Sequence, residues 1–455
     1  MSKFKNFNIK DNEVLKGSVY LNNSKKNIDK DEYMILNMKH NLSYKIESEE
    51  SKNPNLLNDF KIRFKRYREN WNLQPKSCIE KKFLGTQMAN EKIIPLCVDV
   101  EVASICDLAC PFCYREFIVT PDKIINEKLC LNLIDQAGEM GVPSMKFNWR
   151  GEPLLNPKIY DYINYAKKKG ILETIINTNA TNLTEANSKK LIDSGLDLMI
   201  YSFDGGTKKT YEKMRPGRFH QNSFEKVYKN IKNFHRIRSD KGSKFPFTKI
   251  QMILTKDTTN EVDEFFNNFR GIVDNVTVNQ YTERGGDIKD LNDEEKSKYK
   301  NILKENNFPE NTPYMKDIEG NIKFATGREP CKQPFQRLLV TYEGKVAMCC
   351  YDWGASHPVG YTDEKAFNNS SDYKEVVQKI RNKKKGFELL KDAKLSTEHN
   401  KPQKKLNTLK EIWLGSEIDK VRIKHLNNQG DDLSICSKCT FKDVYKWNNL
   451  IKIYF

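Results

Sequence analysis

The chain has 455 residues, enough for a sizeable core and two or three domains. Its formal net charge is +16, but Lys and Asn recur along the whole length instead of clustering on one face. This spread favours a solvated surface over a nucleic-acid or acidic-membrane interface. No apolar run reaches the roughly 18 residues of a membrane span, and the N-terminus lacks the apolar segment of a signal peptide, so we expect a cytoplasmic protein.

Eleven cysteines in a reducing compartment are expected to be metal ligands, reactive thiols or core residues rather than disulfides. The first region, residues 1–90, is rich in Asn, Lys and Glu and predicts a polar, partly flexible extension. Residues 56–71 within it have a helical pattern. We expect this helix to dock on the body of the protein, with docking on a partner as the alternative.

Residues 91–290 alternate short apolar runs with helix-length amphipathic segments, which predicts an α/β fold with a parallel sheet. Gly141, Gly170 and Gly195 stand where helices are expected to end. Six strand–helix units favour a partial (β/α)6 barrel of the TIM type, with ligand sites at the carboxyl ends of the strands. The predicted strands are residues 96–103, 144–149, 174–179, 196–203, 249–255 and 275–279.

Residues 291–330 are expected to form a polar connector, and residues 331–455 a small C-terminal domain without the strand–helix rhythm. This domain has a Lys-rich insertion at about 376–405, which we interpret as a solvated loop or helix rather than a nucleic-acid tract.

Three cysteines, Cys106, Cys110 and Cys113, follow directly after the first predicted strand. Three thiolates on one loop can hold three irons of a cubane cluster and leave the fourth iron open for a ligand. A zinc site is the alternative, although zinc normally takes four ligands and no fourth Cys or His is nearby.

The C-x3-C-x2-C spacing, with Phe112 before its last cysteine, resembles the radical S-adenosylmethionine (radical SAM) superfamily. The resemblance implies a 4Fe-4S cluster whose open iron binds the amino and carboxylate groups of S-adenosylmethionine. Electron transfer from such a cluster cleaves this cofactor to a 5'-deoxyadenosyl radical.

Further segments resemble the same family in the same order. In WRGEP, Glu152 matches the glutamate that accepts a hydrogen bond from the cofactor's amino group, although Arg150 replaces a frequent glycine. The resemblance also implies that Asn179 and Ser202 lie near the methionine or ribose part of the cofactor, and that Arg215 lies near its carboxylate. Purely structural roles remain open for these three residues, and Asp204 and Gly205 are interpreted as turn formers.

The C-terminal region carries a second set of cysteines. Residues 338–342 and 345–349 are strand-like and Glu343-Gly344 is turn-like, so a β-hairpin is expected to bring Cys331 and Cys349 together. Cys436 and Cys439 form a C-x2-C pair, and four thiolates can fully ligate one 4Fe-4S cluster. Zinc is the alternative here.

The spacing of Cys331, Gly344 and Cys349 is similar to that of SPASM and twitch auxiliary-cluster domains. No cysteine follows Cys439, so the resemblance is to the shorter twitch type with one auxiliary 4Fe-4S cluster. Cys350 is an alternative ligand to Cys349. The other cysteines, Cys78, Cys97 and Cys130, are expected in the core.

The resemblance implies hydrogen-atom abstraction from a small polar substrate, sugar-like or aminocyclitol, for oxidation or epimerisation. It also implies an electron donor such as flavodoxin or ferredoxin. The alternatives are a peptide-modifying maturase, an RNA-modifying enzyme, and a non-enzymatic iron-sulfur or zinc-binding protein. No catalytic acid or base is identified from the sequence.

Overall fold

The computed structural model describes most of the predicted barrel and the C-terminal cysteine region. The described residues are 18–22, 55–113, 115, 120–243, 245–255, 257–280, 304, 314–316, 322–368, 405–437, 439 and 444–449. The expected Lys-rich insertion, apart from residue 405, and most of the expected connector and N-terminal extension lie outside this part of the chain.

Six parallel strands form the centre of the fold, as predicted. They run in sequence order across a larger sheet, from β2 to β7. Their bounds are β2 Cys97–Val100, β3 Ser144–Lys146, β4 Glu173–Thr178, β5 Leu198–Ser202, β6 Phe247–Leu254 and β7 Asn275–Gln280. The described part of this sheet is open, because its ten strands follow the linear order β1-β7-β6-β5-β4-β3-β2-β10-β11-β12. β1, Ser18–Asn22, pairs antiparallel with β7.

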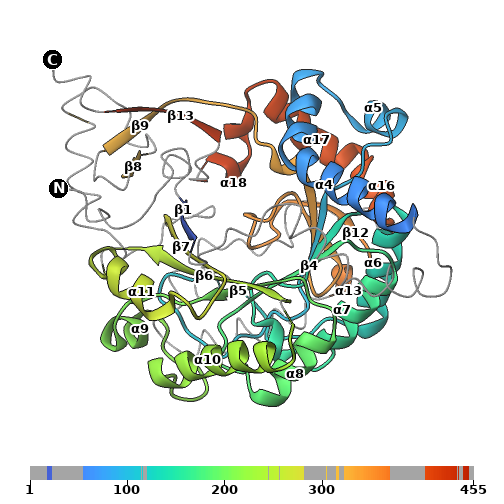
Figure 1. Ribbon diagram of the computed structural model, residues 1–455. Helices are drawn as coiled ribbons and strands as arrows, with labels where there is room; N and C mark the ends of the chain where they lie inside the picture. The colour runs from blue at the N-terminus through green and yellow to red at the C-terminus, as the bar shows by residue number, and fades with distance from the viewer. Residues whose placement is uncertain are drawn as a thin grey trace.

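Helices connect the parallel strands and lie in an arc along their outside (Figure 1). Four of them begin at side chains that accept hydrogen bonds from backbone N–H groups, including Asn126 and Thr184. Gly141, Gly170 and Gly195 follow three of them at positive φ angles, as predicted. The helices are α6 Glu127–Glu139, α7 Ile159–Lys168, α8 Glu185–Asp193, α9 Lys208–Met214, α10 Phe224–Asp240 and α11 Val262–Phe269, with short 3-10 turns η2 Pro153–Leu155 and η3 Thr259–Glu261.

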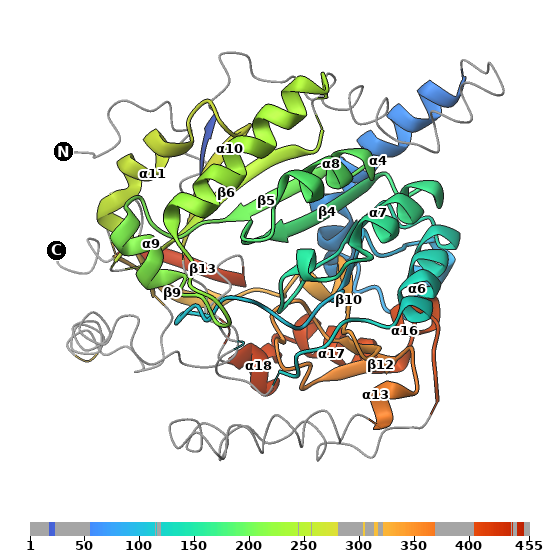
Figure 2. The same cartoon turned by 90° about the horizontal axis from the view of Figure 1, so that it is seen from below.

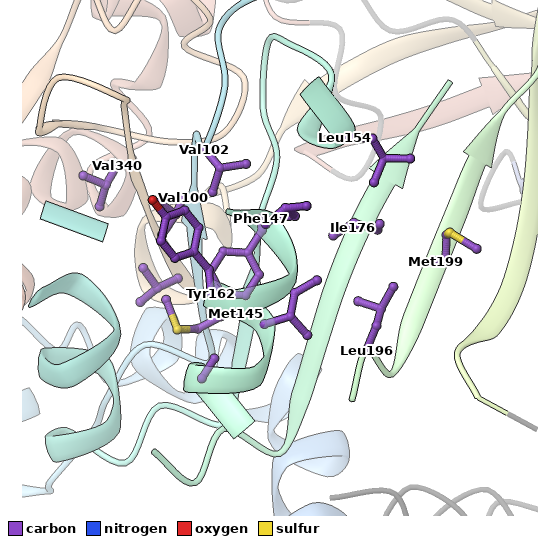
Figure 3. Packing of buried hydrophobic residues seen from close by; sticks show 14 of the residues in the cluster. Val100, Val102, Met145, Phe147, Leu154, Tyr162, Ile176, Leu196, Met199 and Val340 are labelled. Carbon is purple, nitrogen blue, oxygen red and sulfur yellow. The ribbon is translucent and has the colours of Figure 1, made fainter. Parts of the chain in front are cut away.

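The main hydrophobic core lies between the strands and this arc of helices. Strand side chains alternate between the two faces of the sheet, so every second residue of each strand enters this core. Figure 3 shows Tyr162 of α7 beside Phe147 and Met145, with Ile176 and Met199 on the neighbouring strands. The residues between them point to the inner face of the barrel.

The predicted C-terminal hairpin extends this sheet beyond β2. β10, Arg337–Val340, pairs with β11, Lys345–Ala347, and also lies parallel to β2. Gly344 turns the hairpin at a φ of 93°, and a Cβ there would stand 2.7 Å from the Cβ of Asp363. β12, Pro358–Tyr361, completes the edge and is followed by α13, Lys365–Asn368.

Helix α4, Asn55–Glu80, packs across the N-terminal ends of the strands, which confirms the expected docking on the body. The Tyr67 hydroxyl donates to Glu173 at the start of β4 over 2.7 Å, and the Arg337 guanidinium at the start of β10 lies 5.0 Å from the Trp71 ring centroid. A short helix, α5 Gly85–Asn90, leads into β2.

The remaining C-terminal elements gather beside β12, on the side of the molecule away from α10 and α11 (Figure 2). They are η4 Gln333–Phe335, α16 Leu409–Trp413, α17 Ser416–Leu426, η5 Gly430–Asp432 and α18 Ser434–Ser437. A small antiparallel sheet lies beyond them, with β8 Tyr314–Lys316, β9 Ile322–Arg328 and β13 Tyr445–Asn449 in the order β13-β9-β8. Among the described helices, none has the length and apolar character required to cross a membrane.

Candidate functional site

The first three cysteines lie on the loop that leaves β2 at its carboxyl end. The loop is held in place by backbone contacts with residues 216–217, where Ala109 N–H donates to Pro216 and Leu108 forms a β-bridge with Gly217. Cys113 N–H donates to the Cys110 carbonyl over 3.0 Å, so the loop turns back on itself. This turn keeps the thiols of Cys106, Cys110 and Cys113 within electrostatic range of one another.

Burial keeps the thiols of Cys106 and Cys110 protonated in the protein without metal. It raises the pKa of Cys106 to about 12, with the nearby charge of Glu152 adding to the shift, and it raises the pKa of Cys110 well above its ordinary value. Thiolates bind metal, so loading this loop with iron releases protons.

The WRGEP segment packs directly against this loop, and the glycine at its centre is required for the approach. A Cβ on Gly151 would lie 2.4 Å from the carbonyl oxygens of Ala103 and Ile105. Glu152 N–H donates to Ile105 over 2.9 Å. The contact fixes the Glu152 carboxylate beside the cysteine loop.

The Glu152 side chain is 3% exposed and accepts three hydrogen bonds, from Leu154 N–H, the Thr178 hydroxyl and Asn179 N–H, over 2.7 to 3.1 Å. A carboxylate has about four acceptor positions, which leaves room for one more donor. Burial raises its pKa to about 7, and the neighbouring charge of Asp107 adds to the shift.

Asn179 follows β4 directly and faces the cysteine loop. Its amide nitrogen donates to Asp107 over 2.8 Å and stands 4.0 Å from the Cys106 sulfur. The Thr181 hydroxyl lies within hydrogen-bond distance of carboxylate and amide oxygens of Asp107 and Asn179, and its single proton can go to either. Sequence reasoning missed Asp107 as a member of the site, although it lies between two of the cysteines.

Arg215 and Ser202 come from the next part of the barrel. The Arg215 guanidinium donates to the Asp204 carboxylate over 2.5 and 2.8 Å and lies 5.7 Å from the Phe112 ring centroid. Asp204 also accepts from Ile253 N–H and is fully buried, so its role exceeds that of a turn former. Ser202 ends β5, half-buried, in register with Gln251 of β6.

The departure from the family pattern at Arg150 has a structural explanation. The guanidinium forms a bidentate ion pair with the Glu101 carboxylate, with both nitrogen–oxygen distances at 2.7 Å and both side chains buried. It also donates to the Trp353 carbonyl over 3.3 Å. Arg150 therefore connects the end of β3 to the C-terminal cysteine region.

The four predicted C-terminal cysteines line one cavity. Cys331 precedes η4, Cys349 follows β11, and Cys436 and Cys439 lie at α18 and just after it. No group of three His, Cys, Asp or Glu side chains in the described part of the chain is arranged to hold a single metal ion. The donor set around the cavity, four thiols from separate elements, matches in type and number the ligands of one 4Fe-4S cluster.

Two residues in the lining of this cavity were missed by sequence reasoning. His425 Nε2 stands 3.7 Å from the Cys436 sulfur, and burial lowers the pKa of this histidine to about 4, with the charge of Arg328 adding. The Nε of Arg328 is buried and has no hydrogen-bond partner among the described residues. Both residues belong to elements that contain no cysteine, so the spacing of the C-terminal cysteines could not predict them.

Cys350 faces a different environment from Cys349. Its thiol donates to Gln333 over 3.4 Å, and its carbonyl accepts from the Trp149 indole over 3.0 Å. Cys350 is not part of the cavity lining, whereas Cys349 is. The other three cysteines, Cys78, Cys97 and Cys130, are buried in the core as expected.

The first cysteine loop fits the group that its spacing implies. The three cysteines pack in one cluster with Leu108, Phe112 and Met214, and the Asn179 backbone and side-chain amides lie between the Glu152 carboxylate and the Cys106 sulfur. Cys106, Cys110 and Cys113 would hold a 4Fe-4S cluster there, which would supply the electron for cleavage of S-adenosylmethionine.

Comparison with known proteins points to the same family that the cysteine spacing resembles. Residues 100–268 match the model of the Radical SAM superfamily. Among curated relatives, the chain is 27% identical over 172 residues to the tungsten-containing aldehyde ferredoxin oxidoreductase cofactor-modifying protein of Pyrococcus furiosus, covering 36% of this chain and 45% of that protein. It is 23% identical over 171 residues to a mycofactocin maturase of Mycolicibacterium smegmatis, covering 38% of this chain and 41% of that protein.

The chain thus spans less than half the length of these curated relatives. Among solved structures, it is similar to SuiB of Streptococcus suis bound to the precursor peptide SuiA, with 15% identity, 94% of this chain and 90% of that chain covered, and a TM-score of 0.46. The match over residues 100–268 therefore assigns this part of the chain to the radical SAM superfamily.

Proposed function

We propose that this enzyme generates a 5'-deoxyadenosyl radical at the Cys106–Cys113 loop and uses it to abstract a hydrogen atom from a small polar substrate, for oxidation or epimerisation. The observation that carries the proposal is the convergence of this loop with Glu152 and Asn179 at the carboxyl ends of three neighbouring strands. Ligand sites of parallel sheets lie at this edge.

Each residue near the loop has a proposed task. Glu152 has one acceptor position left for the amino group of the cofactor. Asn179 and Ser202 offer polar groups to its methionine or ribose part. Arg215 keeps a full positive charge beside the cofactor carboxylate, because the buried Asp204 partner favours its charged form.

The C-terminal cavity is proposed to hold one auxiliary 4Fe-4S cluster of the twitch type, ligated by Cys331, Cys349, Cys436 and Cys439. A fully ligated cluster has no open iron, so its role is electron transfer or shaping of the substrate region. A reducing, cytoplasmic environment and a donor such as flavodoxin or ferredoxin suit both clusters.

A small polar substrate is supported by the inner face of the barrel, where half-buried polar side chains alternate with the core residues. Asn148, Asn177, Gln251 and Asn279 belong to this face. A peptide substrate is the second candidate, favoured by the similarity to a mycofactocin maturase.

The test is release of 5'-deoxyadenosine by the anaerobically reconstituted, reduced full chain with S-adenosylmethionine. Wild type and Cys130→Ala, which removes a core thiol outside both sites, should release it, and Cys113→Ala should not. Release by Cys113→Ala at the wild-type rate would contradict the proposal. Deuterium transfer from labelled sugars or peptides into the product then separates the two substrate classes.

A further inference from the structure

A buried histidine lies in the wall of the four-cysteine cavity. His425 belongs to the last turn of α17 and is 2% exposed. It lines the cavity together with the four C-terminal cysteines, although α17 itself contains no cysteine. A polar ring is therefore buried directly beside the thiols that are proposed to hold the auxiliary cluster.

The glycine that begins η5 packs closely on this ring. A Cβ on Gly430 would stand 3.0 Å from Nδ1 and 3.1 Å from Cε1 of His425, which is tighter than most contacts in proteins. The Nε of Arg328 would stand 3.6 Å from the same Cβ. The edge of the ring that carries Nδ1 is therefore enclosed by backbone and by the guanidinium.

The two ring nitrogens of His425 have different partners, and one of them determines where the ring proton lies. The backbone N–H of Cys331 donates to Nδ1 over 3.5 Å, so Nδ1 is an acceptor and carries no proton. The hydrogen bond at one ring nitrogen sets the state of the other. The neutral ring therefore carries its proton on Nε2.

The protonated nitrogen faces one of the cysteines. Nε2 stands 3.7 Å from the Cys436 sulfur, within the range of a hydrogen bond to sulfur. A metal-bound cysteine is a thiolate, which has no proton and can only accept. Hydrogen bonds to a charged acceptor are stronger than those between neutral groups, so the thiolate form of Cys436 would favour this contact.

We infer that His425 donates an Nε2–H hydrogen bond to the Cys436 sulfur when the auxiliary cluster is bound, and that this bond raises the reduction potential of the cluster. The inference rests on the proposed auxiliary cluster and makes His425 a positioning residue that acts through Cys436. Hydrogen bonds to ligating sulfurs are among the factors that set iron-sulfur potentials. A donor offsets negative charge on the sulfur and so favours the reduced, more negative state.

Direct ligation of iron by His425 is the competing role. An imidazole binds metal through a nitrogen without a proton. Ligation through Nε2 would move the ring proton to Nδ1, where it would meet the N–H of Cys331. The four thiols around the cavity also equal the number of ligands that one 4Fe-4S cluster takes. The geometry therefore favours a donor over a fifth ligand.

The first test detects the nitrogen at the cluster directly. The reconstituted, reduced full chain is prepared without S-adenosylmethionine and with 15N in its histidine rings, and electron spin echo envelope modulation measures the coupling of 15N to the cluster. We expect a weak coupling in wild type that is lost in His425→Phe. The control is His235→Phe on α10, where the ring lies beside Arg238, and it should keep the coupling.

Two results of this measurement would overturn the inference. Equal spectra of wild type and His425→Phe would show that no histidine nitrogen bonds to the cluster sulfur at this place. A strong coupling, typical of a nitrogen bound to iron, would make His425 a ligand. The wild-type spectrum needs no substitution, so a folding defect in the variant cannot produce the signal.

The second test is the reduction potential of the auxiliary cluster. We expect His425→Phe to lose about tenfold of the preference for the reduced state, a fall of about 59 mV for one electron. His425→Gln keeps an N–H donor and should recover part of that loss. An unchanged potential in His425→Phe would overturn the inference, because the hydrogen bond would then have no effect on the cluster.

Iron analysis separates this inference from the proposed function. A wild-type chain with about eight irons holds both clusters, so the nitrogen coupling and the potential decide the role of His425 alone. A wild-type chain with about four irons lacks the auxiliary cluster and overturns the inference with it. Release of 5'-deoxyadenosine would still report the radical chemistry of the first cysteine loop in that case.

Discussion

The guanidinium of Arg150 forms a bidentate ion pair with the carboxylate of Glu101, with both nitrogen–oxygen distances at 2.7 Å. Both side chains are at most 1% exposed. Glu101 also accepts from Tyr342 N–H after β10, and Arg150 donates to the Trp353 carbonyl. Trp353 in turn packs with the Cys110 and Phe112 cluster. One buried ion pair thus joins the two cysteine regions of the chain.

Breaking this pair should destabilise the whole fold. Arg150→Ala leaves the Glu101 carboxylate buried without its cation, which costs about 3–5 kcal/mol. Denaturant unfolding of the reconstituted chain measures the loss. Arg236→Ala, which breaks an exposed ion pair with Asp240, is the matched control and should cost less than about 1 kcal/mol.

A double variant separates charge from packing at the same place. Glu101→Leu combined with Arg150→Met removes both charges and keeps most of the volume, so it should recover much of the stability lost in Arg150→Ala. A double variant less stable than Arg150→Ala would show that the hydrogen bonds to Tyr342 and Trp353, rather than the buried charge, dominate.

The pKa of Glu152, about 7, predicts how cofactor binding depends on pH. The ionised carboxylate accepts more strongly from the cofactor's amino group than the protonated acid does, so affinity should fall as the pH drops below this pKa and level off above it. Isothermal titration of the reconstituted protein with S-adenosylmethionine across this range measures the slope.

Glu152→Gln should weaken cofactor binding by about 1.5–3 kcal/mol above that pKa and flatten the profile. Glu139→Gln, an exposed position on α6, should leave both the affinity and the profile unchanged. A Glu152→Gln protein with the wild-type slope would assign the pH dependence to another group.

The cavity lining predicts which of two adjacent cysteines holds the auxiliary cluster. Cys349 lines the cavity and Cys350 does not, so Cys349→Ser should lower iron from about eight to about four per chain, while Cys350→Ser should not. Iron analysis and electron paramagnetic resonance of each reconstituted variant distinguish them. The reverse pattern would make Cys350 the ligand.

Local patterns were enough to predict the six parallel strands, their glycine caps and the hairpin at Gly344. The convergence of Glu152 and Asn179 was also predictable, because the carboxyl ends of neighbouring parallel strands meet at one edge. Contacts between residues distant in the sequence were not predictable. Alternation within β10 says nothing of its pairing with β2, and no motif links Arg150 to Glu101 or Arg328 to Cys436.

Arg328 also bears on the reduction potential of the auxiliary cluster. Its guanidinium lines the four-cysteine cavity and donates to the Cys436 carbonyl over 2.7 Å, while its buried Nε has no partner among the described residues. A positive charge and a donor beside a cluster favour its reduced, more negative state, because they stabilise added electrons.

Arg328→Gln should therefore lower the potential of the auxiliary cluster and leave that of the first cluster unchanged. Each 1.4 kcal/mol of lost stabilisation corresponds to about 59 mV for one electron. Redox titration followed by electron paramagnetic resonance resolves the two signals. Arg328→Lys keeps the charge but not the Nε donor, so an intermediate shift would divide the effect between charge and hydrogen bond. An unchanged potential in both variants would mean that the guanidinium acts only on the fold, through its contact with the Cys436 loop.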